Sequence, residues 1–295
     1  MFVAVLSDKP ELRESFCKLV GKETGKDDIS FYTMNFNGRI TTLIDPTLYP
    51  DKIQPLLYTL SLADYVVLIV ESLTPKVGEI MLALNSVKLD KGIIVSSAEL
   101  PVAGTVLEKF ERTGDMETAK QKILSLEAGN EAGERVVALI DKSFNVKSVG
   151  NVALGSVKAG KIKKHDKLFL LPERKEVEVR TIQINDKDSE EASFGDRFGI
   201  AYKGDLVERG VLVPLRSEFE VSNNLNGTFS KNPFFKDELK GKVHAYLNYQ
   251  FVEGVVLENE LKLDKPIAFE KGDQLIIVDA SNQKLRIAGV FRSKW

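Results

Sequence analysis

Residues 138–204 read ALIDKSFNVKSVGNVALGSVKAGKIKKHDKLFLLPERKEVEVRTIQINDKDSEEASFGDRFGIAYKG and determine the kind of domain expected at the centre of the chain. Short apolar runs follow one another at regular intervals, and glycine, proline and asparagine separate them. Short strands with this punctuation are typical of a closed antiparallel barrel. We therefore predict an all-β domain over residues 129–215.

The sequence on either side of this domain has two different patterns. Residues 1–128 alternate strand-like runs with helical runs, which predicts an α/β domain with a mostly parallel sheet covered on both faces. Residues 216–295 return to short strands and predict a second small β-barrel. The small and polar segment Glu127–Glu134 is the expected linker.

Composition excludes several classes of protein. The formal charge of −2 over 295 residues leaves only a local basic patch for nucleic acid. The longest apolar run, Tyr65–Val70, is too short to span a bilayer, and Asp8 and Lys9 interrupt the N-terminal apolar stretch. A single cysteine, Cys17, and two separated histidines favour a reducing compartment and no metal site. We expect a cytoplasmic protein without a membrane span, a metal or a cofactor.

The central segment resembles the second domain of the translational GTPases, and most closely elongation factor Tu and its selenocysteine-specific relative. Four motifs carry the resemblance: FNVKSVGNVALGSV (144–157), KAGKIKKHDKL (158–168), EEASFGDRFGIAYKG (190–204) and ERGVLV (208–213). The segment KPIAFEKGDQLIIVDASNQKLRIAGVF (265–291) is similar to the end of the family's third domain. The resemblance implies a P-loop-GTPase-like, doubly wound domain at 1–128 followed by two antiparallel β-barrels.

The phosphate loop of this family departs from its pattern here. In the family, glycines let backbone amides approach the phosphates, a lysine reaches the terminal phosphates, and a hydroxyl binds magnesium. The matching positions of this chain hold Ser7, Leu12, Arg13 and Glu14. Leu12 adds bulk where the backbone must come close, and Glu14 adds negative charge beside the expected metal.

The other two nucleotide motifs depart as well. Asp45 matches the aspartate of the second motif, but Leu48 stands for its glycine and Tyr49 for the histidine that positions water. The base-reading motif corresponds to Ser96, Ser97, Ala98 and Glu99, of which only Glu99 is acidic. The segment between the first two motifs is also short for the family's first switch. We therefore predict that the domain is a pseudo-GTPase, not an enzyme, with no GTP site.

Binding to RNA is the activity that the resemblance leaves open. The family's pocket for the aminoacylated end of tRNA falls on Gln183, Asp186 and Arg197, none of which matches the residues typical of elongation factor Tu. An arginine at this place is more similar to the selenocysteine-specific branch, and an arginine can clamp a phosphate or stack on a base. The alternative for Arg197 is an arginine at the barrel rim that is paired with a nearby acid.

Local basicity supplies a second candidate RNA surface. Seven lysines lie between Asp141 and Lys167, and Lys147, Lys161, Lys163 and Lys164 are the candidate RNA-binding residues among them. Clustered lysines can follow a phosphate backbone, with an affinity that depends on salt. They are equally typical of solvated hairpin turns.

These observations lead to one leading hypothesis and two alternatives. The leading hypothesis is a non-hydrolysing paralogue of an elongation factor that binds tRNA or a translation complex through its barrels. The first alternative is a scaffold without RNA, which binds a genuine translation factor or forms a homo-oligomer. The second is a translation elongation GTPase with an unorthodox nucleotide site.

Overall fold

The computed structural model describes residues 1–127, 133, 135–239 and 241–294. The described chain forms two compact units. The first comprises Met1–Ala128, Lys231–Leu239 and Ile276–Val290, and the second comprises Gly129–Ser230, Lys240–Leu275 and Phe291–Trp295. Most of the expected linker, Glu127–Glu134, lies outside the described residues. The predicted domain boundaries at 128/129 and 215/216 stay predictions.

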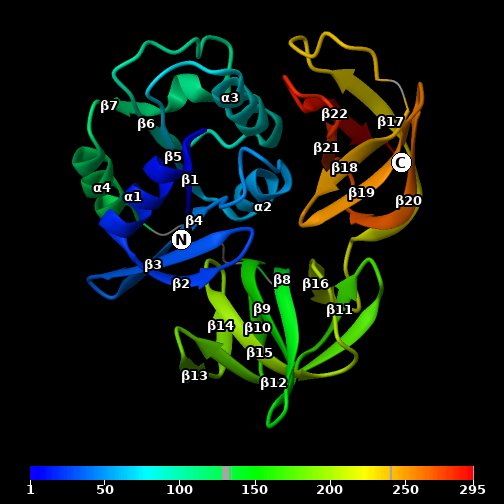
Figure 1. Cartoon of the computed structure of the whole chain (residues 1–295). Coiled ribbons are helices and arrows are strands. Elements are labelled where there is room, and N and C mark those ends of the chain that lie inside the picture. The colour runs from blue at the N-terminus through cyan, green and yellow to red at the C-terminus, as the bar shows by residue number, and fades with distance from the viewer. Residues whose placement is uncertain (128–132, 134, 240, 295) are drawn as a thin grey trace. The chain divides into compact units, whose positions relative to one another are not determined.

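A seven-stranded sheet forms the centre of the first unit (Figure 1). Its strand order is β2-β3-β4-β1-β5-β6-β7, with parallel pairing from β4 through β1 and β5 to β7. The strands span Phe2–Leu6 (β1), Lys22–Lys26 (β2), Ser30–Phe36 (β3), Arg39–Asp45 (β4), Tyr65–Ile69 (β5), Gly92–Val95 (β6) and Glu111–Thr113 (β7). The sequence does not predict β2 and β7, because both are short and largely polar edge strands.

Four α-helices cover the two faces of this sheet. Helices α1 (Pro10–Val20) and α4 (Met116–Ser125) share one core cluster, to which β1 contributes Val3 and Val5 and α1 contributes Phe16. Figure 1 shows α2 (Gln54–Leu62) and α3 (Pro75–Val87) on the opposite side of the sheet, and a short 3-10 helix spans Val106–Lys109. Successive side chains of a strand point to opposite faces of the sheet. A completely buried strand such as β1 therefore packs against the helices on both faces.

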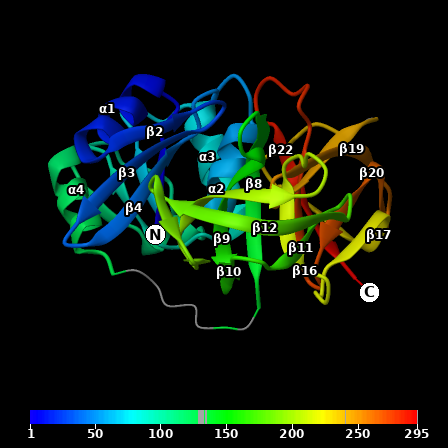
Figure 2. The ribbon, with the colours of Figure 1, turned by 90° about the horizontal axis from the view of Figure 1, so that it is seen from below.

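The central β-barrel is confirmed. Strands β11-β16-β8-β9-β15-β12 form a ring that pairing between β11 and β12 closes (Figure 1, Figure 2). The strands span Val137–Val146 (β8), Gly150–Ala159 (β9), Lys161–Lys163 (β10), Lys167–Leu171 (β11), Lys175–Ile184 (β12), Lys187–Ser189 (β13), Glu191–Ser193 (β14), Arg197–Lys203 (β15) and Gly210–Pro214 (β16). Strand β10 pairs with β14, and β13 extends β12.

One glycine of the motif FNVKSVGNVALGSV is required by the close approach of β9 to β8. A Cβ atom on Gly155 would lie 2.5 Å from the carbonyl oxygen of Leu139 and 2.9 Å from the ring of Phe198. No side chain fits at the first distance, so only glycine allows β9 to approach β8 here. Two residues beyond Leu139, Asp141 forms a bulge in the pairing of β8 with β9, and the bulge changes the direction of its side chain.

The second predicted barrel is also closed, with the order β17-β20-β19-β18-β21-β22. Its strands span Glu220–Lys231 (β17), Val243–Leu247 (β18), Gln250–Val256 (β19), Glu260–Phe269 (β20), Gln274–Val278 (β21) and Ile287–Ser293 (β22). The predicted fold, an α/β domain followed by two antiparallel barrels, is therefore confirmed. Within the part of the chain that the structure describes, no helix combines the length and the apolar character that crossing a membrane requires.

Candidate functional site

The turn between β1 and α1 is only three residues long. Helix α1 begins at Pro10, so Leu12 and Arg13 lie in its first turn and not in a loop before it. The Lys9 amide donates to Oγ of Ser7 at 3.2 Å, the Leu12 amide donates to the Lys9 carbonyl at 3.3 Å, and Pro10 has no amide hydrogen. These backbone donors are used inside the turn, whereas a phosphate cradle directs them at the ligand.

Arg13 is completely buried at the position of the family's lysine. Its Nε atom donates to Oδ1 of Asp45 at 2.6 Å and its Nη1 atom donates to the carbonyl of Ser7 at 2.7 Å. Its Nη2 atom donates to the carbonyls of Pro46 and Tyr49 at 3.1 and 2.8 Å. All three nitrogens of the guanidinium therefore bind protein oxygens, and the arrangement can neutralise Asp45.

Asp45 ends β4, and its carboxylate is also buried. Burial raises the pKa of the Asp45 carboxyl, and the Arg13 guanidinium opposes that rise. In the family the matching aspartate belongs to the second nucleotide motif. In this chain its charge partner is Arg13, so the residues matched to two separate motifs form one ion pair.

Acidic side chains lie around the same turn. Oδ2 of Asp8 accepts a hydrogen bond of 2.7 Å from Oγ1 of Thr74, the residue that caps α3. Lys9 forms an ion pair with Glu71, and Glu14 pairs with Lys18 at 2.6 Å. The carboxylates of Asp8 and Glu14 would repel an entering phosphate.

Tyr49 and Leu48, at the water-positioning end of the second motif, have different environments. Tyr49 is 1% exposed, its hydroxyl donates to the Lys76 carbonyl at 2.7 Å, and burial raises its pKa far above the usual value. Leu48 is 39% exposed. Tyr49 therefore anchors its segment to α3 and does not face solvent, where it could orient a water molecule.

A second buried arginine reaches the same segment from the loop between β21 and β22. Arg286 is 6% exposed, and its Nε atom binds both oxygens of Glu79 on α3, at 3.0 and 3.2 Å. Its Nη1 atom donates to the Asp51 carbonyl at 3.1 Å, and its guanidinium lies 5.7 Å from the ring centroid of Tyr49. All these residues belong to the first compact unit. No sequence signal points to this cluster.

The base-reading positions follow β6. Oγ of Ser96 accepts from the Ala98 amide at 3.0 Å, which closes a local turn, while Ser97 and Glu99 are exposed. A carboxylate at Glu99 is therefore available to solvent, and the serine hydroxyl is used within the turn. Among the residues that the structure describes, no group of three His, Cys, Asp or Glu side chains could hold a metal ion.

The three candidate pocket residues of the central barrel lie at the end of β12, in the turn after it and at the start of the neighbouring strand β15. Gln183 donates to Oδ1 of Asp188 at 3.0 Å, and Asp186 has a φ of 61° in the exposed turn between β12 and β13. Arg197 starts β15 and forms an ion pair with Asp141, the bulged residue of β8. The structure therefore places Arg197 in the arrangement of the alternative interpretation, an arginine paired with a nearby acid.

Further residues surround the ion pair of Arg197 and Asp141. Nε of Arg209 donates to the Asp141 carbonyl at 2.7 Å, and its guanidinium lies 5.9 Å from the ring centroid of Tyr249, in the turn between β18 and β19. Tyr249 is 2% exposed, and burial raises its pKa well above the usual value. Solvent is excluded from this environment at Tyr249, and no motif in the sequence groups these residues.

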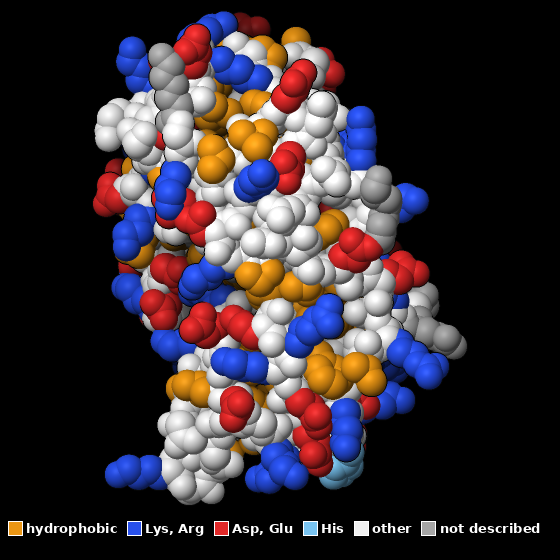
Figure 3. Space-filling view, turned by 90° about the vertical axis from the view of Figure 1, so that its right-hand side faces the viewer, with side chains coloured by type: hydrophobic (Ala, Val, Ile, Leu, Met, Phe, Trp, Pro, Cys, Tyr) orange, Lys and Arg blue, Asp and Glu red, His pale blue; other side chains and the backbone are white. Residues whose placement is uncertain are grey.

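The candidate lysines divide into two groups. Lys161 pairs with Glu191 at 2.8 Å and Lys164 pairs with Glu190 at 2.6 Å. The side chains of Lys147 and Lys163 are exposed. On the face that Figure 3 shows, basic and acidic side chains are interspersed. An RNA surface at the candidate positions would therefore depend mostly on Lys147 and Lys163.

The two adjacent phenylalanines before β18 have opposite environments. Phe235 is 2% exposed and lies under the ammonium group of Lys231, 5.7 Å from the ring centroid. Phe234 is 68% exposed. Phe235 therefore packs inside the protein, whereas Phe234 presents an apolar side chain to solvent.

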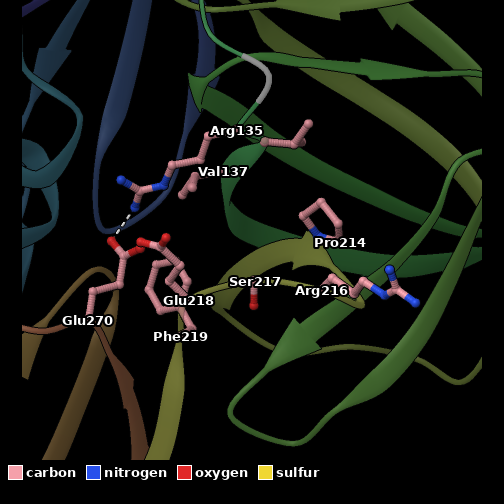
Figure 4. Close-up of a pocket in the computed structure, with 9 residues that line it drawn as sticks. Arg135, Val137, Pro214, Arg216, Ser217, Glu218, Phe219 and Glu270 are labelled. Atoms are coloured by element: carbon pink, nitrogen blue, oxygen red, sulfur yellow. Dashed lines mark hydrogen bonds and ion pairs between the residues drawn. The ribbon is translucent and has the colours of Figure 1, made fainter.

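A pocket of about 310 Å³ lies in the second unit (Figure 4). Arg135 and Glu270 form an ion pair on one side of it, and the Arg135 guanidinium lies 5.9 Å from the ring centroid of Phe219. The charged residues Arg216 and Glu218 also line the pocket, so its wall is both charged and apolar.

The sequence is similar to proteins of known and unknown role. No family model matches the chain. It is 33% identical over 297 residues to the uncharacterized protein MJ0325 of Methanocaldococcus jannaschii, which covers 92% of this chain and 94% of that protein. It is 25% identical over 213 residues to the selenocysteine-specific elongation factor of the same organism, covering 61% of this chain and 45% of that factor. It is 36% identical over 110 residues to elongation factor 1-alpha of Nanoarchaeum equitans, 23% of that factor.

Solved structures share the whole fold. Translation elongation factor SelB from Methanococcus maripaludis, in complex with the GTP analogue GppNHp, matches the entire chain with a TM-score of 0.83 at 19% identity, over 79% of that structure. A bacterial selenocysteine-specific elongation factor matches with a TM-score of 0.79 at 18% identity, over 58% of its length. At these identities the likeness concerns the fold alone.

Fold and sequence together define the class: this is a translational-GTPase-like protein with the three-part architecture of the selenocysteine-specific elongation factors. Within that class, the chain belongs to the same family as MJ0325 of Methanocaldococcus jannaschii.

Proposed function

We propose that this protein is a paralogue of a translation elongation factor that does not hydrolyse GTP and that binds tRNA or a translation complex through its β-barrels. The observation that carries the first part is the ion pair of Arg13 and Asp45, which occupies the positions of the phosphate-binding lysine and the second-motif aspartate. The second part rests on the likeness of the central barrel to elongation factors. A protein acting on translation would work in the cytoplasm.

Without a nucleotide cycle, GTP cannot time binding and release. A regulator, a chaperone or a competitor of a genuine factor fits this situation better than a delivery cycle. Fold alone does not carry function, so the RNA-binding part needs a direct test.

The test is ultraviolet crosslinking of the tagged protein in its native cells, followed by sequencing of bound RNA. We expect enrichment of a tRNA or a ribosomal RNA segment, which the double substitution Lys147→Gln and Lys163→Gln reduces. The matched control is Lys161→Gln with Lys164→Gln, because these lysines already pair with acids. RNA at background level with the unmodified protein would remove the RNA part of the proposal.

A scaffold without RNA is the second candidate, and the pairing of the barrel cations favours it. Arg197, Lys161 and Lys164 all have acidic partners, which lowers the positive charge available to RNA. Association with a protein partner through apolar contacts should change little between 50 and about 200 mM salt, whereas RNA binding through several lysines weakens steeply. Measuring partner capture at both salt concentrations separates the two functions.

A further inference from the structure

The segment Pro46–Lys52 is held from two sides by buried arginines. Arg13 on α1 donates to its Pro46 and Tyr49 carbonyls, and Arg286 donates to its Asp51 carbonyl while its guanidinium lies over the Tyr49 ring. The segment also has bonds of its own, from the Tyr49 amide to the Pro46 carbonyl and from the Lys52 amide to the Leu48 carbonyl, both 2.8 Å. A loop of seven residues thus has contacts to a helix on one side and to a distant hairpin on the other.

Each arginine is fixed by a buried carboxylate as well. Arg13 pairs with Asp45, and Arg286 pairs with Glu79, whose side chain is completely inaccessible to solvent. A buried guanidinium that loses its acceptors bears the full cost of desolvation, which is larger than for an exposed ion pair. Movement of Pro46–Lys52 would remove carbonyl acceptors from both cations at once, so the segment and the two arginines favour one common arrangement.

We propose that Arg13 and Arg286 form a built-in latch that keeps Pro46–Lys52 in a single conformation without a bound nucleotide. In a segment that depends on a nucleotide, the bound nucleotide would hold the conformation. Here the two arginine side chains hold it instead. The inference rests on the part of the proposed function that excludes a GTP cycle. It adds that helix α1 and the hairpin Ile276–Val290 are coupled through this segment.

Hydrogen exchange of the full-length protein tests the latch. The amides of Leu48, Tyr49 and Lys52 are hydrogen-bonded, while Pro46 and Pro50 have none, so a peptide covering 47–52 reports on the segment. We expect slow exchange in the unmodified protein and at least tenfold faster exchange in Arg286→Gln. Arg180→Gln, at an exposed position of β12, should leave exchange in the segment unchanged.

Substitution of the second arginine tests the coupling. Arg13→Lys keeps the cation but lacks the fork that reaches several carbonyls, so it should also speed exchange in 47–52. In the combined variant Arg13→Lys and Arg286→Gln, the exchange rate of 47–52 should rise. Its fold-increase should be smaller than the product of the fold-increases in the two single variants. Unprotected exchange of 47–52 in the unmodified protein, or no change in Arg286→Gln, would overturn the latch.

A second arm separates the latch from the proposed function. The unmodified protein is measured with 1 mM GppNHp and magnesium, and we expect the same exchange as without nucleotide. Added protection over Ser7–Glu14 would contradict the absence of a nucleotide site, which concerns the proposed function. The exchange of 47–52 without nucleotide tests the latch independently of the result with GppNHp.

Discussion

The Nε atom of Arg13 lies 2.6 Å from Oδ1 of Asp45, although the resemblance matches these residues to the lysine and the aspartate of two different nucleotide motifs. Both side chains are buried. A lysine has a single point of charge, whereas a guanidinium has a planar set of donors that can bind a carboxylate and several carbonyls together. The arginine at this position therefore binds Asp45 and three backbone carbonyls together.

The ion pair predicts a large loss of stability on removal of the cation. Arg13→Met leaves Asp45 buried without its partner, and we expect the free energy of unfolding to fall by about 3–5 kcal/mol. The double substitution Arg13→Met and Asp45→Asn removes the stranded charge and should recover part of that loss. Urea denaturation measures both, and a loss below about 1 kcal/mol in Arg13→Met would contradict the assignment.

Magnesium-GTP should not stabilise the protein. A ligand present at 100 times its dissociation constant adds about 2.7 kcal/mol to the stability of the state that binds it, a shift of several degrees in Tm. We expect no shift at millimolar GTP or GDP, because the Arg13 donors already bind protein oxygens. A rise that depends on nucleotide concentration would favour the alternative of an unorthodox GTPase.

The single cysteine should be unreactive in the folded state. Cys17 is completely buried on α1, and burial raises the pKa of its thiol well above the usual value. The reactive form of a thiol is the thiolate, so both effects suppress reaction. Labelling with a thiol reagent should proceed only after denaturant is added. The variant Cys17→Ser provides the blank, and rapid labelling of the native protein would show that α1 opens locally.

Acidification should destabilise the second barrel through His244. Burial lowers the pKa of His244 below 6.5, the ordinary value, and its ring stacks on Phe251 at a centroid distance of 4.5 Å. The unfolded state then binds more protons than the folded state, so stability is complete above about pH 6.5 and falls as the pH drops through the folded pKa.

The measurement compares urea unfolding at pH 7.5 and pH 5.0. The unmodified protein should lose more stability between these values than His244→Phe, which keeps a ring against Phe251 but cannot take up a proton. Phe251→Leu keeps the histidine and should retain the pH-dependent loss. An equal loss in the unmodified protein and His244→Phe would show that other groups cause it.

The sequence predicts the fold well, because the apolar runs and glycines that indicate strands and turns lie within short stretches of sequence. Glycines such as Gly155 are required by close approach of strands, and the buried strand at Phe2–Leu6 is continuous in the sequence. The edge strand Lys22–Lys26 is not predicted, since it has neither an apolar run nor clear alternation.

The candidate site is predicted only in part. Reading Arg13 and Asp45 against the family identifies the altered positions, but the bond between them depends on where the helix begins. The pairing of Glu79 with Arg286 joins residues that are 207 positions apart, and no periodicity or motif connects them. Likewise, the bulge that turns Asp141 toward Arg197 is a property of strand pairing.

The pairing of Glu79 with Arg286 has a consequence for the order of events during synthesis. A ribosome that adds about 5–20 residues per second needs about 10–40 s to reach Arg286 after Glu79. During that interval helix α3 lacks the cation that its buried carboxylate binds in the finished protein. The packing around Glu79 therefore cannot be completed until the chain has been synthesised as far as Arg286.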